Sequence, residues 1–420
     1  MRNYDPFAPE FWSDPYPAYR ALRDHAPGHR APGSGAYCIS RYEDVLAVLK
    51  QPETFSSRAM FTVLLNNGKE GFPPLNWDVA RFLLLFPLRT RMNPFAFPKA
   101  RNLIAEDPPV HGTLRGLVNR GFTPRRIAAW EPRVRAVVAE QLGKLRRGEP
   151  FDVVEDLAVP LPVTIIAEMI GVEPERRQDF KRWSTALIEG ATGAGRARPF
   201  APAFVDSVLE FMAYLRSVVR SRRRAPGDDL ISAILAQEPG GSALSDMEAL
   251  GFVQLLLVAG NETTTNLIGN AVQALLDHRD QLERVRRDPS LVPNLVEEAL
   301  RYEAPVQIVF RTATRDAEVA GTPIPAGSLV AVLLGSANRD ERRFEDPDRF
   351  DVARETRGHL AFGFGEHFCL GSALARLEAS AVLEALVPEL ADLERASAQR
   401  ELVDSFLVRG PRHLELRKAA

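Results

Sequence analysis

The chain has 420 residues, of which 45% are hydrophobic and 26% charged, and its formal net charge is −2. Such a chain can bury a large core, and its near-neutral balance argues against a protein that seeks nucleic acid through overall charge. Its two cysteines, Cys38 and Cys369, lie far apart in sequence, so no disulfide framework is expected and a reducing compartment fits. Residues 1–17 are broken by prolines and carry charges, which predicts neither a signal peptide nor a membrane span. We therefore expect a soluble, cytoplasmic protein.

Helices are expected along most of the chain, with strand character only in short β-branched runs. No repeat, low-complexity linker or long charge block divides the sequence, so we expect a single domain over residues 1–420. The expected helices are 17–25, 41–50, 110–119, 124–147, 160–170, 174–189, 200–224, 245–277 and 370–387, and the expected strands are 308–313 and 328–334.

The longest expected helix begins at Ser245, where Ser245 and Glu248 have the spacing of a capping box. Residues 250–259 are almost all apolar, which predicts a helix buried nearly all round. Its centre carries residues that are poor choices for a buried helix, in the run Ala259-Gly260-Asn261-Glu262-Thr263-Thr264-Thr265. The Thr263 hydroxyl can reach the Ala259 carbonyl and loosen the helix, and Gly260 leaves space for a small molecule. The alternative is a kinked core helix whose polar groups are satisfied internally.

Cys369 lies in a loop directly before the last expected helix. The loop reads Phe362-Gly363-Phe364-Gly365-Glu366-His367-Phe368-Cys369-Leu370-Gly371. A thiolate at a helix N-terminus is stabilised by free N–H groups and the positive end of the dipole. The glycines let the backbone turn tightly against something flat and pass close to it, while Phe362 offers a ring and His367 a donor. A buried thiolate is costly unless a metal takes it, so the simplest interpretation is an iron ligand; the alternative is an inert buried cysteine.

The run FGFGEHFCLG, followed by SALARLE, resembles the haem-binding loop and following helix of the cytochromes P450. The resemblance extends over essentially the whole chain and points to the soluble bacterial type. It implies a mainly α fold with small β-sheets, in which the haem lies between a long central helix and the helix after the cysteine. It also implies haem b with Cys369 as axial thiolate and iron ligand, and it places four further residues around the haem. These are Phe362, Gly363, His367 and Gly371.

In the long helix, the resemblance places the family's acid–alcohol pair on Glu262 and Thr263, beside Ala259 and Gly260. The pair is implied to deliver protons through water while the O–O bond of dioxygen breaks heterolytically.

Glu298 and Arg301 stand three residues apart on one expected helical face. Taken alone, such a pair is an exposed ion pair. The resemblance joins it to an arginine in the later loop, which matches Arg349, and makes the triad structural and not catalytic.

Haem propionates need cations, and four residues match by resemblance. They are His111, Arg115, Arg311 and His367. Arginine binds carboxylates bidentately and histidine donates from a ring nitrogen, although a solvated surface charge is the alternative for each.

By resemblance, an apolar pocket holds the substrate, which predicts a lipophilic small molecule. Its expected walls are Leu256, Ala259, Gly260, Val306, Ile308, Val309, Phe406 and Leu407. The candidate lids are residues 190–195 and the segment 55–107, which is longer than is typical of the bacterial family. That segment could cap the pocket or contact a partner, or it could form a helix that simply packs on the core.

The favoured function is a monooxygenase that inserts one oxygen atom from O2 into a steroid, terpenoid, fatty acid or polyketide-like compound, as in secondary metabolism. No dinucleotide-binding motif is found, so electrons are expected from a ferredoxin or flavodoxin. An acidic ferredoxin could meet Arg120, Arg125 and Arg126 on the cysteine side. Two alternatives stay open: a peroxide-driven peroxygenase, against which Glu262 and Thr263 argue, and a haem protein that binds or senses without turnover. We expect a monomer with no nucleic-acid partner and no membrane span.

Overall fold

The computed structural model describes residues 3–60, 63, 77–93, 101–191, 202–236 and 244–419. The chain forms two compact units. The first comprises Met1–Ala59, Ile127–Pro162 and Thr263–Ala420, and the second comprises Met60–Arg126 and Val163–Glu262. The candidate lid at 190–195 lies outside the described residues except for its first two positions, and the segment 55–107 is described only in part. The single domain over residues 1–420 stays a prediction.

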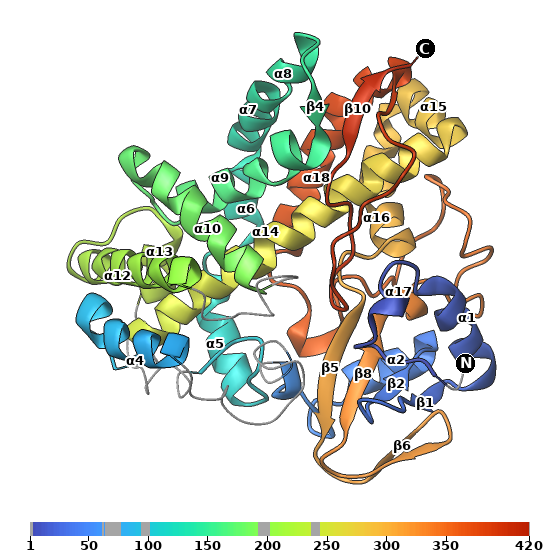
Figure 1. The fold of residues 1–420 in the computed structure, drawn as a ribbon, viewed down its shortest axis with the longest axis horizontal. Helices are drawn as coiled ribbons and strands as arrows, with labels where there is room; N and C mark the ends of the chain where they lie inside the picture. The colour runs from blue at the N-terminus through green and yellow to red at the C-terminus, as the bar shows by residue number, and fades with distance from the viewer. Residues whose placement is uncertain are drawn as a thin grey trace. The chain divides into compact units, whose positions relative to one another are not determined.

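The strands of the described residues lie in the first unit, and the largest sheet has the order β1-β2-β8-β5-β3. β2 and β8 pair in parallel, and the other neighbours are antiparallel. β8 is apolar throughout because it is paired along both edges and buried. Figure 1 shows β5 and β8, from late in the chain, beside β1 and β2 from its beginning. The strands are β1 (Gly28–Arg30), β2 (Tyr37–Ile39), β3 (Phe55–Ser56), β5 (Ile308–Ala313) and β8 (Leu329–Leu333).

Two smaller sheets complete the β structure of the described residues: the order β4-β10-β9 and the hairpin β6–β7. Their strands are β4 (Phe151–Asp152), β6 (Ala317–Val319), β7 (Thr322–Ile324), β9 (Leu393–Arg395) and β10 (Glu415–Lys418).

The first unit also contains eight of the helices among the described residues, together with short 3₁₀ or π-helical turns. The helices are α1 (Tyr16–His25), α2 (Tyr42–Leu49), α7 (Glu131–Gln141), α8 (Gly143–Arg146), α15 (Arg279–Arg287), α16 (Val292–Tyr302), α17 (Leu334–Ala337) and α18 (Ser372–Leu386). The short turns are Pro9–Phe11, Val153–Ala158, Pro289–Leu291, Gly365–His367 and Glu389–Asp392.

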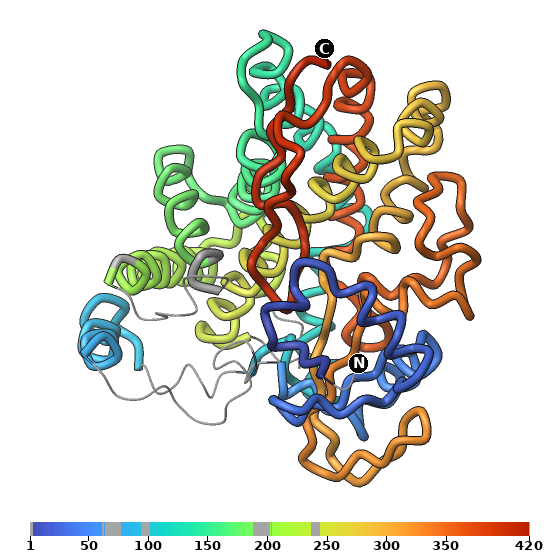
Figure 2. Tube along the Cα trace, turned by 45° about the vertical axis from the view of Figure 1, so that its right-hand side comes forward, coloured from blue at the N-terminus to red at the C-terminus, as the bar shows by residue number. Residues whose placement is uncertain are grey.

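A cluster of half-buried side chains around the buried Arg339 connects the N-terminal segment to the rest of the first unit. The Tyr16 hydroxyl donates to Glu303 Oε1 at 2.7 Å. The Arg339 guanidinium lies 3.8 Å from the ring centroids of both Tyr16 and Tyr302, which are cation–π contacts. Figure 2 shows the N-terminal part of the tube alongside the strands from the last third of the chain.

The helices of the second unit are α4 (Trp77–Thr90), α5 (Val110–Asn119), α10 (Arg177–Ala191), α12 (Pro202–Arg224) and α13 (Leu230–Leu235), with the 3₁₀ turn Pro174–Arg176. Three more helices contain a boundary between the units along the chain: α6 (Pro124–Ala128), α9 (Pro160–Met169) and α14 (Asp246–Asp277). α14 is the expected long helix, and its capping box is confirmed. The Ser245 amide donates to Glu248 Oε2 at 2.8 Å, and the Glu248 amide donates to Ser245 Oγ at 3.3 Å.

The expected helix at 124–147 is wrong in its continuity, because the structure breaks it into α6, α7 and α8. Pro132 lies in the first turn of α7, a position that proline favours but through which a preceding helix cannot run. The other expected helices and strands among the described residues are present, with ends shifted by a few residues at most. No helix among the described residues is both long enough and apolar enough to cross a membrane.

Candidate active site

Backbone hydrogen bonds hold Cys369 in a closed loop before α18. The Cys369 amide donates to the Phe362 carbonyl at 2.9 Å, and the Gly363 amide donates to the Leu360 carbonyl at 2.9 Å. Cys369 is half-buried and lies three residues before Ser372, the first residue of α18. The structure therefore presents the thiol at the start of a helix, as the sequence predicts.

Two glycines of the loop have the backbone conformation that the expected tight turn requires. Gly363 and Gly365 both have φ of 71°, a left-handed conformation that favours glycine. A Cβ on Gly365 would lie 3.2 Å from the Leu49 carbonyl oxygen, which is a close approach. At Gly371 a Cβ would meet no protein atom within 4 Å, and the expected close approach of this residue to a flat bound group stays a prediction. The open space beside this loop fits a flat prosthetic group held by Cys369.

The other cysteine, Cys38, is unsuited to hold a metal. It lies in β2 with no exposed surface, and its thiol is placed 3.8 Å from the Ala36 carbonyl oxygen. Burial raises the pKa of the Cys38 thiol far above its usual range, which keeps it protonated.

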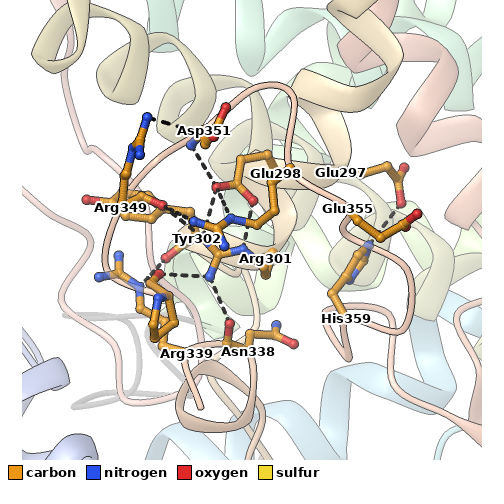
Figure 3. Close-up of polar contacts among 12 residues, drawn as sticks. Glu297, Glu298, Arg301, Tyr302, Asn338, Arg339, Arg349, Asp351, Glu355 and His359 are labelled. Atoms are coloured by element: carbon orange, nitrogen blue, oxygen red, sulfur yellow. Dashed lines mark hydrogen bonds and ion pairs between the residues drawn. The ribbon is translucent and has the colours of Figure 1, made fainter. Parts of the chain in front are cut away.

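Glu298 and Arg301 form a fully buried pair on α16, as Figure 3 shows. Arg301 donates from Nε to Glu298 Oε2 at 2.7 Å and from Nη2 to Oε1 at 2.8 Å, which is the bidentate geometry. Arg301 also donates to the carbonyls of Asn338 and Pro347. The pair is therefore an internal clamp on the segments before the cysteine loop and not an exposed ion pair.

The third member of the triad needs a correction. The structure places the Arg354 guanidinium, and not that of Arg349, on Glu298, with Nε 3.2 Å from Oε1. Arg349 supplies only its carbonyl to Arg301, while its side chain is exposed and is directed toward Asp351 (Figure 3). The chain meets Glu298 at Asp351, whose amide donates to Glu298 Oε1 at 2.9 Å. Arg354 follows this contact and its guanidinium reaches Glu298, whereas Arg349 precedes it and its guanidinium does not.

A second network on α16 reaches the cysteine loop from Glu297. His359 Nε2 lies 2.9 Å from Glu297 Oε2, and Arg376 of α18 donates to the same carboxylate at 2.5 and 2.9 Å. The Arg376 guanidinium also lies 4.5 Å from the centroid of Phe362. Burial alone would raise the pKa of Glu297, but hydrogen bonds from Arg376 and His359 outweigh it and lower the pKa to about 2. Figure 3 shows the side chains of Glu297 and Glu298 pointing to opposite sides. Glu298 therefore binds the segment around Arg354, whereas Glu297 binds His359 just before the cysteine loop.

The four cations expected near haem propionates lie on three elements. His111 and Arg115 share a face of α5 in the second unit, whereas Arg311 is on β5 and His367 is in the 3₁₀ turn before Cys369, both in the first unit. His111 and Arg311 are buried. Burial, and then the nearby Arg115, lower the pKa of His111. Their role toward the propionates stays a prediction.

The centre of α14 is less enclosed than expected. Leu250, Val253 and Leu257 are buried, but Ala259 is exposed and Glu262 and Thr263 are half-buried. The open residues Ala259 and Thr263 are four apart and so share one face of the helix. Gly260 does not leave space, because a Cβ there would lie 3.1 Å from Ile166 Cδ1. The hydrogen bond expected from Thr263 to Ala259 stays a prediction, as does the proton-delivering role of Glu262.

Only some of the expected substrate-wall residues of the first unit lie next to one another. Val306 forms an antiparallel bridge with Val408, and the Gln307 amide donates to the Leu407 carbonyl at 2.8 Å, so these two segments lie side by side. Ile308 and Val309 are on opposite faces of β5, because side chains alternate along a strand.

Phe406 is not free to line a pocket. Its ring packs 4.9 Å from that of Phe7 and 5.8 Å from that of Phe310, so it belongs to an aromatic cluster on the Ile308 face. The remaining expected wall residue, Leu256, lies on α14 in the second unit and is buried. Val306, Val309 and Leu407 are half-buried and remain candidates.

The chain is similar in sequence to known proteins over nearly its whole length. The family Cytochrome P450 matches residues 202–391. Cytochrome P450 107B1 of Saccharopolyspora erythraea is 39% identical over 391 residues, covering 92% of this chain and 90% of that protein. The 6-deoxyerythronolide B hydroxylase of the same organism is 38% identical over 416 residues, covering 97% of this chain and 96% of that protein.

Solved structures of cytochromes P450 have the same fold as this chain. CYP109Q5 from Chondromyces apiculatus has a TM-score of 0.85 at 42% identity, covering 100% of this chain and 99% of that chain. CYP109E1 from Bacillus megaterium in complex with testosterone has a TM-score of 0.81 at 33% identity, covering 97% of this chain and 100% of that chain. These relatives define a class of haem enzymes with a cysteine thiolate ligand. The chain belongs to the cytochrome P450 family and is a monooxygenase of bacterial type.

Sequence reasoning missed four residues that shape the loop. They are Glu297, Arg354, His359 and Arg376. Two signals could have found part of this set. Glu297 directly precedes Glu298, and two adjacent carboxylates on a helix project in different directions. His359 lies three residues before Phe362, directly before the short apolar run that enters the cysteine loop.

Proposed function

We propose that Cys369 is the cysteine that holds the haem iron, and that the enzyme oxidises a lipophilic small molecule by inserting one oxygen atom from O2. The observation that carries the proposal is the closed loop around Cys369, with its left-handed glycines and the open space at Gly371. The haem, when bound, supplies the oxygen-inserting chemistry. The residues of this chain supply the thiolate and hold its position.

The loop is suited to keep a thiolate in one place. Its amide-to-carbonyl closure fixes the backbone at Cys369, and the start of α18 offers the positive end of a helix dipole. Arg376 and His359 both bind Glu297 and both pack against Phe362. The Phe362 centroid lies 4.5 Å from the Arg376 guanidinium and 6.1 Å from the centroid of the His359 ring. A fixed ligand geometry of this kind needs support from neighbouring residues.

The substrate class is proposed from the open wall and from the relatives. Val306, Val309 and Leu407 are apolar and half-buried, which favours a lipophilic compound. The name of one relative identifies a hydroxylase of 6-deoxyerythronolide B, and a structural neighbour was solved with testosterone. A polyketide-like or steroid-like compound is therefore our first choice, ahead of terpenoids and fatty acids. Hydroxylation and epoxidation both remain within the proposal.

Glu262 and Thr263 are proposed to carry protons to the site of oxygen reduction. They lie half-buried on α14, close to the exposed Ala259, so water can reach them. Replacing Thr263 with alanine should divert reducing equivalents to hydrogen peroxide while substrate affinity stays the same. A peroxide-driven enzyme would show no such change in its peroxide-supported turnover.

An acidic ferredoxin is proposed as the electron donor. A cleft of about 960 Å³ in the first unit is lined by residues 353–360 and, from the cysteine loop, by Phe362, Phe364 and Phe368. Phe364 and Phe368 are exposed beside it, and Lys50 lies 5.4 Å from the centroid of Phe364. Exposed aromatic rings next to cations fit an acidic protein partner. In the second unit, Arg125 is also exposed, whereas Arg126 lies 3.8 Å from Asp228. Lys50→Glu should slow reduction by ferredoxins most at low salt.

The experiment that tests the proposal is the optical spectrum of the reduced protein with carbon monoxide, compared among wild type, Cys369→Ser and Cys38→Ser. We expect the red-shifted Soret band of a thiolate-ligated haem in wild type and in Cys38→Ser, and its loss in Cys369→Ser. The two variants remove the same atom at different sites, so each is the control for the other. Loss of the band in Cys38→Ser with retention in Cys369→Ser would overturn the assignment of the ligand.

A further inference from the structure

α4 has two apolar faces. Successive residues of a helix are turned by about 100°, so Val79, Phe86 and Thr90 share one face. This face is buried, and α4 packs alongside α12, as Figure 1 shows. The opposite face carries Trp77, Leu84 and Leu88, whose exposed fractions are 81%, 66% and 68%. These are the three most exposed large hydrophobic side chains among the described residues. Arg81 lies on the same face between Trp77 and Leu84, and its guanidinium turns to Asp206 of α12 at 3.0 Å.

The outward stripe is unusual for a surface helix. The solvent face of such a helix is normally polar, and a single exposed leucine would need no explanation. Three large apolar side chains aligned over about three turns form a patch, and patches of this kind mark contact sites. Their alignment also means that no rotation of α4 about its axis could bury the outer stripe without exposing the inner one.

A cluster of arginines lies at the C-terminal end of the same helix. Arg216 of α12 donates from Nη1 to the Thr90 carbonyl at 2.8 Å and so caps α4. Arg91 follows Thr90 directly in the chain, and Arg220 lies one helical turn after Arg216 on α12, so the three cations are close together. Burial, and then repulsion from Arg220, lower the pKa of Arg216, while Asp246 opposes the shift and Arg91 adds to it.

Part of this charge is uncompensated. Asp206 forms ion pairs with Arg81 and Arg89. Arg91 and Arg220 are exposed, and the described part of the chain gives neither of them an ion pair. Positive charge therefore remains at one end of the apolar stripe.

We propose that this face of α4 binds the surface of an anionic lipid bilayer. A convex helix face with tryptophan and leucines on one side and arginines at its end has the character of an interfacial helix. Tryptophan favours the headgroup level, the leucines enter the acyl boundary, and Arg91 and Arg220 meet anionic headgroups. A bilayer accepts a convex surface without a matching groove, which a folded protein partner would have to supply.

The test is sedimentation of the purified haem-loaded enzyme with vesicles. The vesicles are either phosphatidylcholine alone or phosphatidylcholine mixed with phosphatidylglycerol. We expect binding to the mixed vesicles at low salt. Leu84→Gln combined with Leu88→Gln should weaken it about tenfold or more, whereas Leu84→Met combined with Leu88→Met should retain it. Arg91→Gln and Arg220→Gln should each weaken it about fivefold on mixed vesicles and leave binding to neutral vesicles unchanged.

Two controls separate this face from the rest of the molecule. Arg417→Gln makes the same charge change at an exposed position of β10 and should have no effect beyond the small loss expected from net charge. Quenching of tryptophan fluorescence by brominated acyl chains should disappear in Trp77→Phe, although three other tryptophans remain.

Three results would overturn the proposal. They are absence of binding to the mixed vesicles at low salt, unchanged binding in the glutamine double variant, and quenching that persists in Trp77→Phe. If sedimentation velocity shows a dimer that the double variant converts to a monomer, and vesicles are not bound, the face instead joins two copies of the chain.

Discussion

The surroundings of α16 and the outer face of α4 differ in whether their side chains find partners inside the fold. Around α16, the buried carboxylate of Glu298 and the half-buried carboxylate of Glu297 are each paired from more than one side within the first unit. On α4 of the second unit, three large apolar side chains face outward. A buried charge must find its partners inside the fold, because leaving it unpaired is costly. An exposed apolar stripe can only be covered from outside. The first region therefore concerns stability and ligand geometry, and the second concerns what the enzyme meets.

The largest effect is expected from Glu298→Ala, which leaves Arg301 buried without its carboxylate. We expect a loss of about 3–5 kcal/mol in the free energy of unfolding, together with loss of haem. Arg354→Ala should cost about 1–3 kcal/mol because it removes one charged hydrogen bond to Glu298. Arg349→Ala should change stability by less than about 0.5 kcal/mol, because that side chain is exposed. Urea unfolding and haem content measure all three, and equal effects of Arg349→Ala and Arg354→Ala would contradict the corrected triad.

Glu378 is an exception within the first region, because its buried Oε1 has no hydrogen-bond partner among the described residues. Burial raises the pKa of Glu378 to about 8. The unfolded chain loses this proton near pH 4.5, so between about pH 5 and 7.5 the unfolded state binds fewer protons and stability falls as pH rises. The contribution is about 1.4 kcal/mol per pH unit.

Glu378→Gln should remove that slope and make the variant the more stable protein by about 3 kcal/mol near neutral pH. Urea unfolding at several pH values measures it. Glu384→Gln changes a carboxyl group on the same helix that is partly exposed and paired with Arg135, and should leave the slope in place. A slope unchanged in Glu378→Gln would show that the carboxyl is not the titrating group.

Glu297 should behave in the opposite sense. Its pKa of about 2 lies below the ordinary value of 4.5, so its stabilising effect is present above pH 4.5 and is lost as pH falls toward 2. We expect Glu297→Gln to cost about 1–2 kcal/mol at pH 7 and much less at pH 3. Unfolding at the two pH values checks this, with Glu355→Gln as an exposed neighbour that should show no such difference.

The smallest effect on stability is expected on α4. Leu84→Gln and Leu88→Gln should each change the free energy of unfolding by no more than about 0.5 kcal/mol, because both side chains are exposed. Phe86→Ala, on the buried face of the same helix, should cost about 3 kcal/mol or more. A large loss in the leucine variants would mean that the outer face is covered within the chain, and it would remove the contrast between the two regions.

The sequence predicted the elements better than the contacts between them. The capping box of α14, the strand at 308–313 and the loop at Cys369 depend on neighbouring residues, and local chemistry is enough to predict them. Arg354 could not be preferred over Arg349, because the choice depends on how the chain turns between them. The tight contact of Gly260 with Ile166 also depends on tertiary packing. The break at Pro132 was predictable, since proline in the first turn of a helix is a local signal.

The parallel pairing of β2 with β8 has a consequence for synthesis on the ribosome. Tyr37 pairs with Val330, about 290 residues later in the chain. The hydrogen bond from the Tyr16 hydroxyl to Glu303 spans a similar distance along the chain. At about 5–20 residues per second, the N-terminal strands wait about 15–60 s for their partners. During that time the edge of β2 is an unpaired template that could join a strand of another chain. The nascent enzyme is therefore most exposed to aggregation before its last third has been translated, and chaperones that bind its first 59 residues should raise the yield of folded protein.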